Sequence, residues 1–155
     1  MCRDGMISIS EGTFLMGSDR HYAEEAPARR VKVSGFLIDA CPVTNREFAL
    51  FVKETGYVTL AEKPADPSLY PAAPPSSLAP ASAVFRKPGR QVNVGNHYNW
   101  WTYLAGADWR HPDGPRSSKN AMQDHPVVHI AFEDADAYAR WCGKSLPTEA
   151  EWEFA

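Results

Sequence analysis

The sequence lacks the features that are typical of membrane proteins and of nucleic-acid-binding proteins. Its apolar runs are only a few residues long, far short of the roughly 20 residues that cross a bilayer. Its first residues lack the apolar stretch of a signal peptide. The formal net charge is −3, which gives no basic excess for binding a nucleic acid. We therefore expect a cytoplasmic protein with neither a membrane nor a nucleic acid as its partner. We also expect a monomer, although the sequence does not determine the oligomeric state.

Cysteine is scarce as well. Cys2, Cys41 and Cys142 lie far apart, and none belongs to a Cys-x-x-Cys pair that would hold zinc or exchange disulfides. The chain also has no glycine-rich phosphate loop and no nucleophile elbow. From these patterns we assign neither a metal site nor a catalytic residue to this segment.

Core-forming residues, in contrast, are plentiful. Hydrophobic residues make up 44% of the 155 positions and aromatic residues 12%, which is enough for one domain over residues 1–155. Alternating or β-prone patterns predict strands over residues 6–10 and 13–16, paired with each other across the turn between them. A second β segment is expected over 31–38. A buried strand over 126–132 and a helix over 134–142 follow later.

Two further helices are predicted from their first residues. Thr44 with Glu47, and Thr148 with Glu151, have the spacing of a capping box, in which each side chain binds the other residue's backbone N–H. Gly56 suits the left-handed position that ends the first of these helices. The second has only about two turns before the chain stops, so we expect this sequence to be the front part of a longer protein.

Between these helices, residues 57–95 have no clear periodicity and many prolines, which predicts a long irregular region. An aromatic cluster follows over 97–103, and then residues 106–115, a loop shaped by two glycines and two prolines. The aromatic cluster is typical both of a packed core and of a binding surface. Trp109 in the loop either contacts a ligand or anchors the loop to the core.

His125 and His129 have the i, i+4 spacing that places two metal ligands on one helix face. Their apolar, β-branched neighbours favour a strand instead. In a strand the two residues would be about 13 Å apart, so we do not expect a shared metal site.

Several motifs in order along the chain resemble those of the formylglycine-generating enzymes, the sulfatase-modifying factors. They are Gly-Thr-Phe-Leu-Met-Gly-Ser (12–18), Val-Thr-Asn-Arg-Glu-Phe (43–48), Thr-Gly-Tyr (55–57), Gly-Ala-Asp-Trp-Arg-His-Pro (106–112), Asp-His-Pro-Val (124–127) and Gly-Lys-Ser-Leu-Pro-Thr-Glu-Ala-Glu-Trp-Glu (143–153). The resemblance implies an α+β, C-type lectin-like fold with little regular secondary structure, of which this chain is the truncated amino-terminal portion.

The resemblance also implies an oxidoreductase activity for the complete protein. In the family, dioxygen oxidises a cysteine in a Cys-x-Pro-x-Arg motif of an unfolded sulfatase polypeptide to Cα-formylglycine. Copper(I), held by two late cysteines, and calcium are the implied cofactors, and both belong to the missing carboxyl-terminal part. We therefore expect residues 1–155 to supply the scaffold and substrate groove and to be inactive alone.

Five residues are expected to bind substrate: Asp66, Trp100, Trp101, Trp109 and Arg110. The aromatic rings would form apolar walls for the proline. Asp66 resembles a family residue that binds the arginine of the motif.

Two departures from the family pattern, and one alternative role, bear on this assignment. Ser145 stands where the family commonly has arginine. Pro42 stands where some members have an acidic residue near the groove, which leaves Asp66 as the main carboxylate. The alternative role for Asp66 is to cap a turn before Pro67.

Two other functions fit the same motifs. One is a non-catalytic binding or regulatory relative that kept the groove and lost the copper cysteines. The other is an iron-dependent sulfoxide synthase, whose partner domain should carry a His-x-x-x-His-x-Glu pattern; this chain has none.

Overall fold

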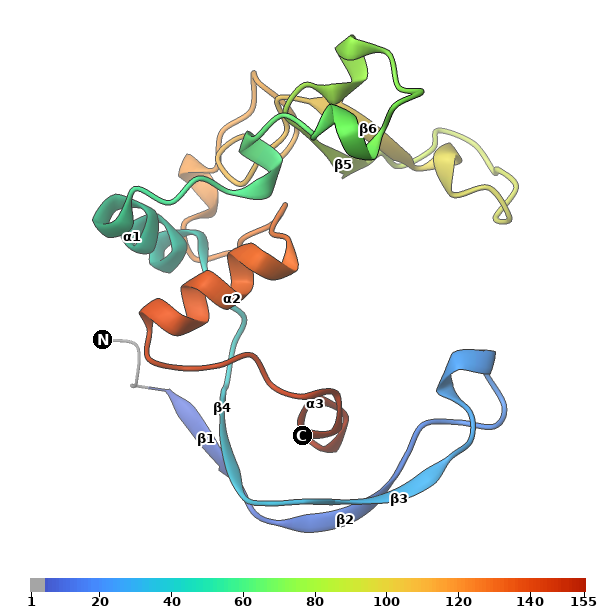
Figure 1. Cartoon of the computed structure of the whole chain (residues 1–155), viewed down its shortest axis with the longest axis vertical. Helices are drawn as coiled ribbons and strands as arrows, with labels where there is room; N and C mark the ends of the chain where they lie inside the picture. Colours follow the sequence, from blue (N-terminus) through green and yellow to red (C-terminus); the bar gives the residue numbers. More distant parts are fainter. Residues whose placement is uncertain (1–4) are drawn as a thin grey trace. The chain divides into compact units, whose positions relative to one another are not determined.

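The computed structural model describes residues 5–155, with Ala121 described by its backbone only. Residues 43–141 form one compact unit, and the segments on either side of it, up to Pro42 and from Cys142, form another. Both units consist of short helices and two-stranded sheets joined by irregular segments (Figure 1). The predicted α+β class with little regular secondary structure is therefore confirmed.

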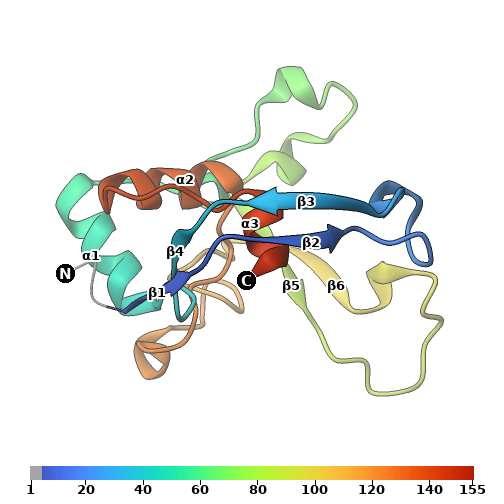
Figure 2. The ribbon, with the colours of Figure 1, turned by 90° about the horizontal axis from the view of Figure 1, so that it is seen from below.

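The unit made of the flanking segments is built on a long antiparallel hairpin. Its elements are β1 (Met6–Ile9), β2 (Gly12–Met16), β3 (Arg29–Val33), β4 (Phe36–Asp39) and α3 (Glu149–Phe154). β1 pairs with β4 and β2 pairs with β3, and Figure 2 shows β2 and β3 running side by side. The predicted pairing of the first two strands with each other is wrong, because the chain continues straight past Glu11 and returns only after β2.

Helix α3 lies against β2 and β3 of the same unit. The ring of Phe154 packs on Phe14, with centroids 5.2 Å apart, and covers Gly12, where a β-carbon would lie 2.5 Å from that ring. Glu153 accepts a hydrogen bond from the backbone N–H of Gly17 at 2.9 Å. The predicted capping box of Thr148 begins the helix.

The unit of residues 43–141 contains the aromatic core. Its elements are α1 (Asn45–Thr55), β5 (Ala81–Phe85), β6 (Trp101–Ala105) and α2 (Phe132–Trp141). The core consists of Phe48, Phe51 and Val52 from α1 together with Trp109. The predicted capping box of Thr44 and Glu47 begins α1, and Gly56, with a φ of 68°, ends it.

The long irregular region contains more structure than predicted. β5 lies within it and pairs antiparallel with β6, so that Ala83 faces Tyr103 and Phe85 faces Trp101. Single 3-10 turns occur at Leu60–Glu62, Pro67–Leu69 and Pro75–Leu78. Strand β5 was not predicted, because its partner β6 follows only after a long connection. In addition, apolar and polar residues alternate only weakly in its sequence, Ala-Ser-Ala-Val-Phe.

The predicted strand over 126–132 is wrong. Only Pro126 forms a β-bridge, with Thr44, and the backbone N–H of Val127 donates to Val43 at 2.9 Å. The chain then turns at His129, whose φ of 59° is incompatible with a strand. Helix α2 consequently begins at Phe132, two residues before the predicted start. None of the helices that the structure describes is long and apolar enough to cross a membrane.

Candidate functional site

The loop of residues 106–115 is a compact turn organised by Asp108. The Asp108 carboxylate accepts hydrogen bonds from the backbone N–H groups of Arg110 at 2.6 Å and His111 at 2.9 Å. Gly106 and Gly114 have φ values of 71° and 101°, which a residue with a β-carbon rarely adopts. The shaped loop expected from the sequence is therefore present.

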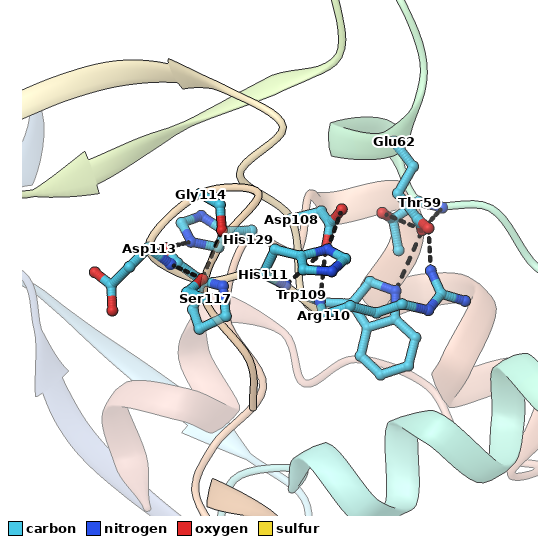
Figure 3. Close-up of polar contacts among 11 residues, drawn as sticks. Thr59, Glu62, Asp108, Trp109, Arg110, His111, Asp113, Gly114, Ser117 and His129 are labelled. Atoms are coloured by element: carbon cyan, nitrogen blue, oxygen red, sulfur yellow. Dashed lines mark hydrogen bonds and ion pairs between the residues drawn. The ribbon is translucent and has the colours of Figure 1, made fainter. Parts of the chain in front are cut away.

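Glu62 fixes this loop to the segment that follows α1 (Figure 3). Its carboxylate accepts from Trp109 Nε1 at 3.2 Å and pairs with the Arg110 guanidinium. The same carboxylate accepts from the backbone N–H and hydroxyl of Thr59, at 3.0 and 2.8 Å. Trp109 is only 2% exposed, so its ring acts as the anchor that was one of the two interpretations of this residue.

A second carboxylate, that of the buried Asp134 near the start of α2, also holds this segment. It accepts from Tyr57 Oη at 3.1 Å, from the backbone N–H of Leu60 at 3.0 Å and from that of Ala131 at 2.9 Å. Burial, and then the hydrogen bond to Asp134, raise the pKa of Tyr57. Neither carboxylate was singled out by sequence reasoning, because their partners are distant in sequence.

This unit contains a cavity of about 760 Å³, and two of the residues held by Asp134, Leu60 and Ala131, line it. Its walls come from the 60–70 segment, from the β5–β6 hairpin and from residues 129–131. The polar and aromatic side chains on the walls are Lys63, Asp66, Tyr70, Ser82, Trp101, Tyr103 and His129. A carboxylate among exposed aromatic rings suits an extended ligand that has both an apolar and a cationic part.

The structure brings together two of the five expected substrate-binding residues. Asp66 and Trp101 both line the cavity, whereas Trp100, Trp109 and Arg110 do not. Trp100 is half-buried, and its carbonyl accepts from the backbone N–H of Arg86 at 2.7 Å. Arg110 lies over the Trp109 ring, 4.4 Å from the centroid, besides pairing with Glu62. Sequence reasoning did not assign Tyr70, Tyr103 or His129 to a site, although the aromatic cluster over 97–103 had drawn attention to Tyr103.

Asp66 has the capping role that was its alternative interpretation. Its Oδ1 accepts from the backbone N–H of Ser68 at 2.8 Å, and this bond lowers the pKa of Asp66. The side chain is exposed, so it remains accessible to a ligand in the cavity while it caps the turn.

Lys119 is the most perturbed cation among the described residues. Its Nζ lies 3.3 Å from the centroid of the Trp109 ring and is buried without a hydrogen-bond partner in the described part of the chain. Burial, and then the charge of Arg110, lower the pKa of Lys119 to about 8. The amine therefore adds positive charge beside the loop at neutral pH but lies outside the cavity wall.

The two described cysteines belong to no cluster of three metal-ligating side chains. Cys41 is exposed and Cys142 is half-buried, while Cys2 lies outside the described residues. Within residues 5–155, no group of three or more His, Cys, Asp or Glu is placed to hold a metal ion. The argument against a shared site at His125 and His129 had rested on a strand that is absent; both ring nitrogens of His129 instead have protein partners.

The chain was compared with known proteins. The family model described as the sulfatase-modifying factor enzyme 1-like domain matches residues 2–155. The formylglycine-generating enzyme of Mycobacterium tuberculosis is 48% identical over 97% of this chain and 50% of its own length. That of Mus musculus is 43% identical over 97% of this chain and 39% of its own length. A mouse relative named inactive C-alpha-formylglycine-generating enzyme 2 is 40% identical over 97% of this chain and 46% of its own length. The chain thus spans half the length of these relatives or less.

Proposed function

Because the chain belongs to the sulfatase-modifying factor enzyme 1-like family, we propose that it is part of a formylglycine-generating oxidase and supplies the enzyme's peptide-binding cavity. The substrate is a cysteine in a Cys-x-Pro-x-Arg segment of an unfolded sulfatase, which the complete enzyme oxidises with dioxygen. The observation that carries this proposal is the cavity that places Asp66 beside Trp101, Tyr103 and Tyr70.

Each wall of the cavity suits one part of such a peptide. On the hairpin, the small Ala83 lies opposite Tyr103, which leaves room beside an aromatic face for a proline ring. Asp66 provides a carboxylate with which an arginine guanidinium pairs in a directional way. Its exposure keeps such a pair in contact with water, so the pair contributes modestly to affinity and more to selectivity.

The described residues do not fit the copper and calcium sites that the family implies. Copper(I) prefers thiolate ligands, and neither described cysteine belongs to a cluster of three or more metal-ligating side chains among the described residues. The proposal therefore assigns no step of the oxidation to this chain. Its residues bind and orient the peptide.

A labelled Cys-x-Pro-x-Arg peptide titrated with the chain tests the proposal by fluorescence anisotropy. Asp66→Asn is the informative variant, because asparagine still caps the turn before Ser68 and only the charge is lost. We expect affinity to fall roughly two- to fivefold, as for an exposed ion pair. A peptide with leucine in place of arginine should bind both proteins equally.

The matched control is Asp136→Asn. It removes one charge from α2, where Asp136 pairs with Arg140 outside the cavity. Failure of the wild-type chain to bind the peptide would refute the proposed function. Equal losses for the two peptides in the Asp66 variant would show that Asp66 supports the turn and does not select arginine.

A non-catalytic binding relative is the second candidate, because the mouse relative named inactive is 40% identical to the chain and the mouse formylglycine-generating enzyme is 43% identical. The two candidates differ in turnover and not in binding. Formation of aldehyde in the same peptide by the full-length protein distinguishes them.

A further inference from the structure

His129 has an unusual backbone conformation. Its φ of 59° is the only positive value at a non-glycine residue among residues 5–155. The left-handed region is disfavoured for a residue with a β-carbon and persists where surrounding contacts fix it, often at functional sites. The contacts of the imidazole ring show what fixes it here.

Both ring nitrogens of His129 bind distant parts of the same unit. Nδ1 lies 2.8 Å from the hydroxyl of Ser82 on β5, and Nε2 lies 2.8 Å from the carbonyl oxygen of Pro112 in the loop that contains Trp109. A carbonyl only accepts, so Nε2 carries a proton and donates it to Pro112. The ring therefore joins β5 to the anchored loop.

The segment that begins at His129 is also connected to the part of the cavity wall that contains Leu60. Two residues later, the backbone N–H of Ala131 donates to Asp134, and the same carboxylate accepts from Leu60. Ser82, Leu60 and residues 129–131 all line the cavity. The β5 wall and the Leu60 wall are thus both attached to one three-residue segment, through the His129 ring at one end and Asp134 at the other.

We propose that His129 is a positioning residue, which sets the spacing of the two cavity walls and thereby the fit of the bound peptide. This inference rests on the proposed function. The left-handed turn directs the ring toward Ser82 and Pro112 while Ala131 continues toward Asp134.

The test uses His129→Gly and Ser82→Ala. Glycine adopts a positive φ freely, so the first variant removes the ring and keeps the turn. We expect the affinity for the Cys-x-Pro-x-Arg peptide to fall about tenfold in His129→Gly, a loss of about 1.4 kcal/mol. Ser82→Ala removes one of the two ring contacts and should have a smaller effect. His125→Ala, which removes a neighbouring exposed histidine, is the control and should bind like the wild type.

Added imidazole provides a readout that general destabilisation would not give. It should occupy the space left in His129→Gly and restore peptide affinity, with no effect on Asp66→Asn. In NMR spectra of His129→Gly, the amides of Leu60 and Ala131 and the indole N–H of Trp101 should shift, and imidazole should reverse the shifts.

The outcomes separate this inference from the proposed function. If the wild type binds the peptide and His129→Gly binds it equally well, the inference is wrong and the proposed function stands. If the wild type binds no peptide, the proposed function fails. The NMR shifts then decide the inference, since unchanged Leu60 and Ala131 amides in His129→Gly would refute the positioning role.

Discussion

Asp134→Ala should be among the most destabilising single substitutions in the unit of residues 43–141. The Asp134 side chain is 1% exposed and accepts hydrogen bonds from Tyr57, Leu60 and Ala131. Alanine leaves all three donors without this acceptor. A buried donor that loses its acceptor costs about 1–3 kcal/mol.

We use the lower end of that range, because all three hydrogen bonds are only partly buried. Three donors at about 1 kcal/mol each give a loss of about 3 kcal/mol in the free energy of unfolding. That is a large share of the ~5–15 kcal/mol that stabilises a typical domain. Tyr57→Phe removes only one of the donors and should cost about 1 kcal/mol.

Urea unfolding followed by circular dichroism measures these losses, and amide hydrogen exchange localises them. In Asp134→Ala, the Leu60 and Ala131 amides should exchange faster than in the wild type. The pKa of Tyr57 should fall toward its ordinary value in Asp134→Asn but stay above it, because burial is the larger cause of the shift. Asp136→Asn on the same helix should change stability by less than about 0.5 kcal/mol. The argument fails if Asp134→Ala and Tyr57→Phe are equally stable. The hydrogen bonds from the backbone N–H groups of Leu60 and Ala131 to Asp134 would then contribute nothing to stability.

Two further predictions concern charge and metal binding. Because the pKa of Lys119 is about 8 in the folded chain and near 10.5 when unfolded, the unfolded chain binds more protons between these values. The wild type should therefore gain stability relative to Lys119→Met as the pH rises from about 8 to 10. Urea titrations of both proteins at each pH measure the difference in their free energies of unfolding. A difference that does not change with pH would contradict the lowered pKa of Lys119. A copper(I) competition titration of the chain should show no tight stoichiometric site and no peptide oxidation, since neither described cysteine belongs to a cluster of three or more metal-ligating side chains. One strongly bound copper per chain, abolished by Cys→Ser substitutions, would show that the cysteines converge.

The sequence predicted those features whose causes are local. The two capping boxes involve residues three positions apart, and Gly56 ends its helix by its own conformational freedom. The loop over 106–115 was recognisable for the same reason, because glycine and proline restrict the backbone wherever they stand.

Features that depend on distant partners were missed. The pairing of β1 with β4 requires the chain to return after two intervening strands, and neither strand carries a local signal for that partner. Trp109 and Glu62 are 47 residues apart. The sequence therefore could not decide whether Trp109 anchors the loop or contacts a ligand. The left-handed turn at His129 has no signature at all, because the residue types around it favour a strand.

The missed residues share a physical role. A chain with little helix and sheet leaves many backbone N–H groups without a regular partner, and each needs an acceptor when it is buried. Glu62 and Asp134 supply such acceptors at Thr59, Leu60 and Ala131. The half-buried Glu62 and the buried Asp134 therefore replace part of the hydrogen bonding that a sheet would provide, and they shape the segment that forms one wall of the cavity. In this unit a polar substitution at those carboxylates should affect the peptide site as strongly as a change in the aromatic core does.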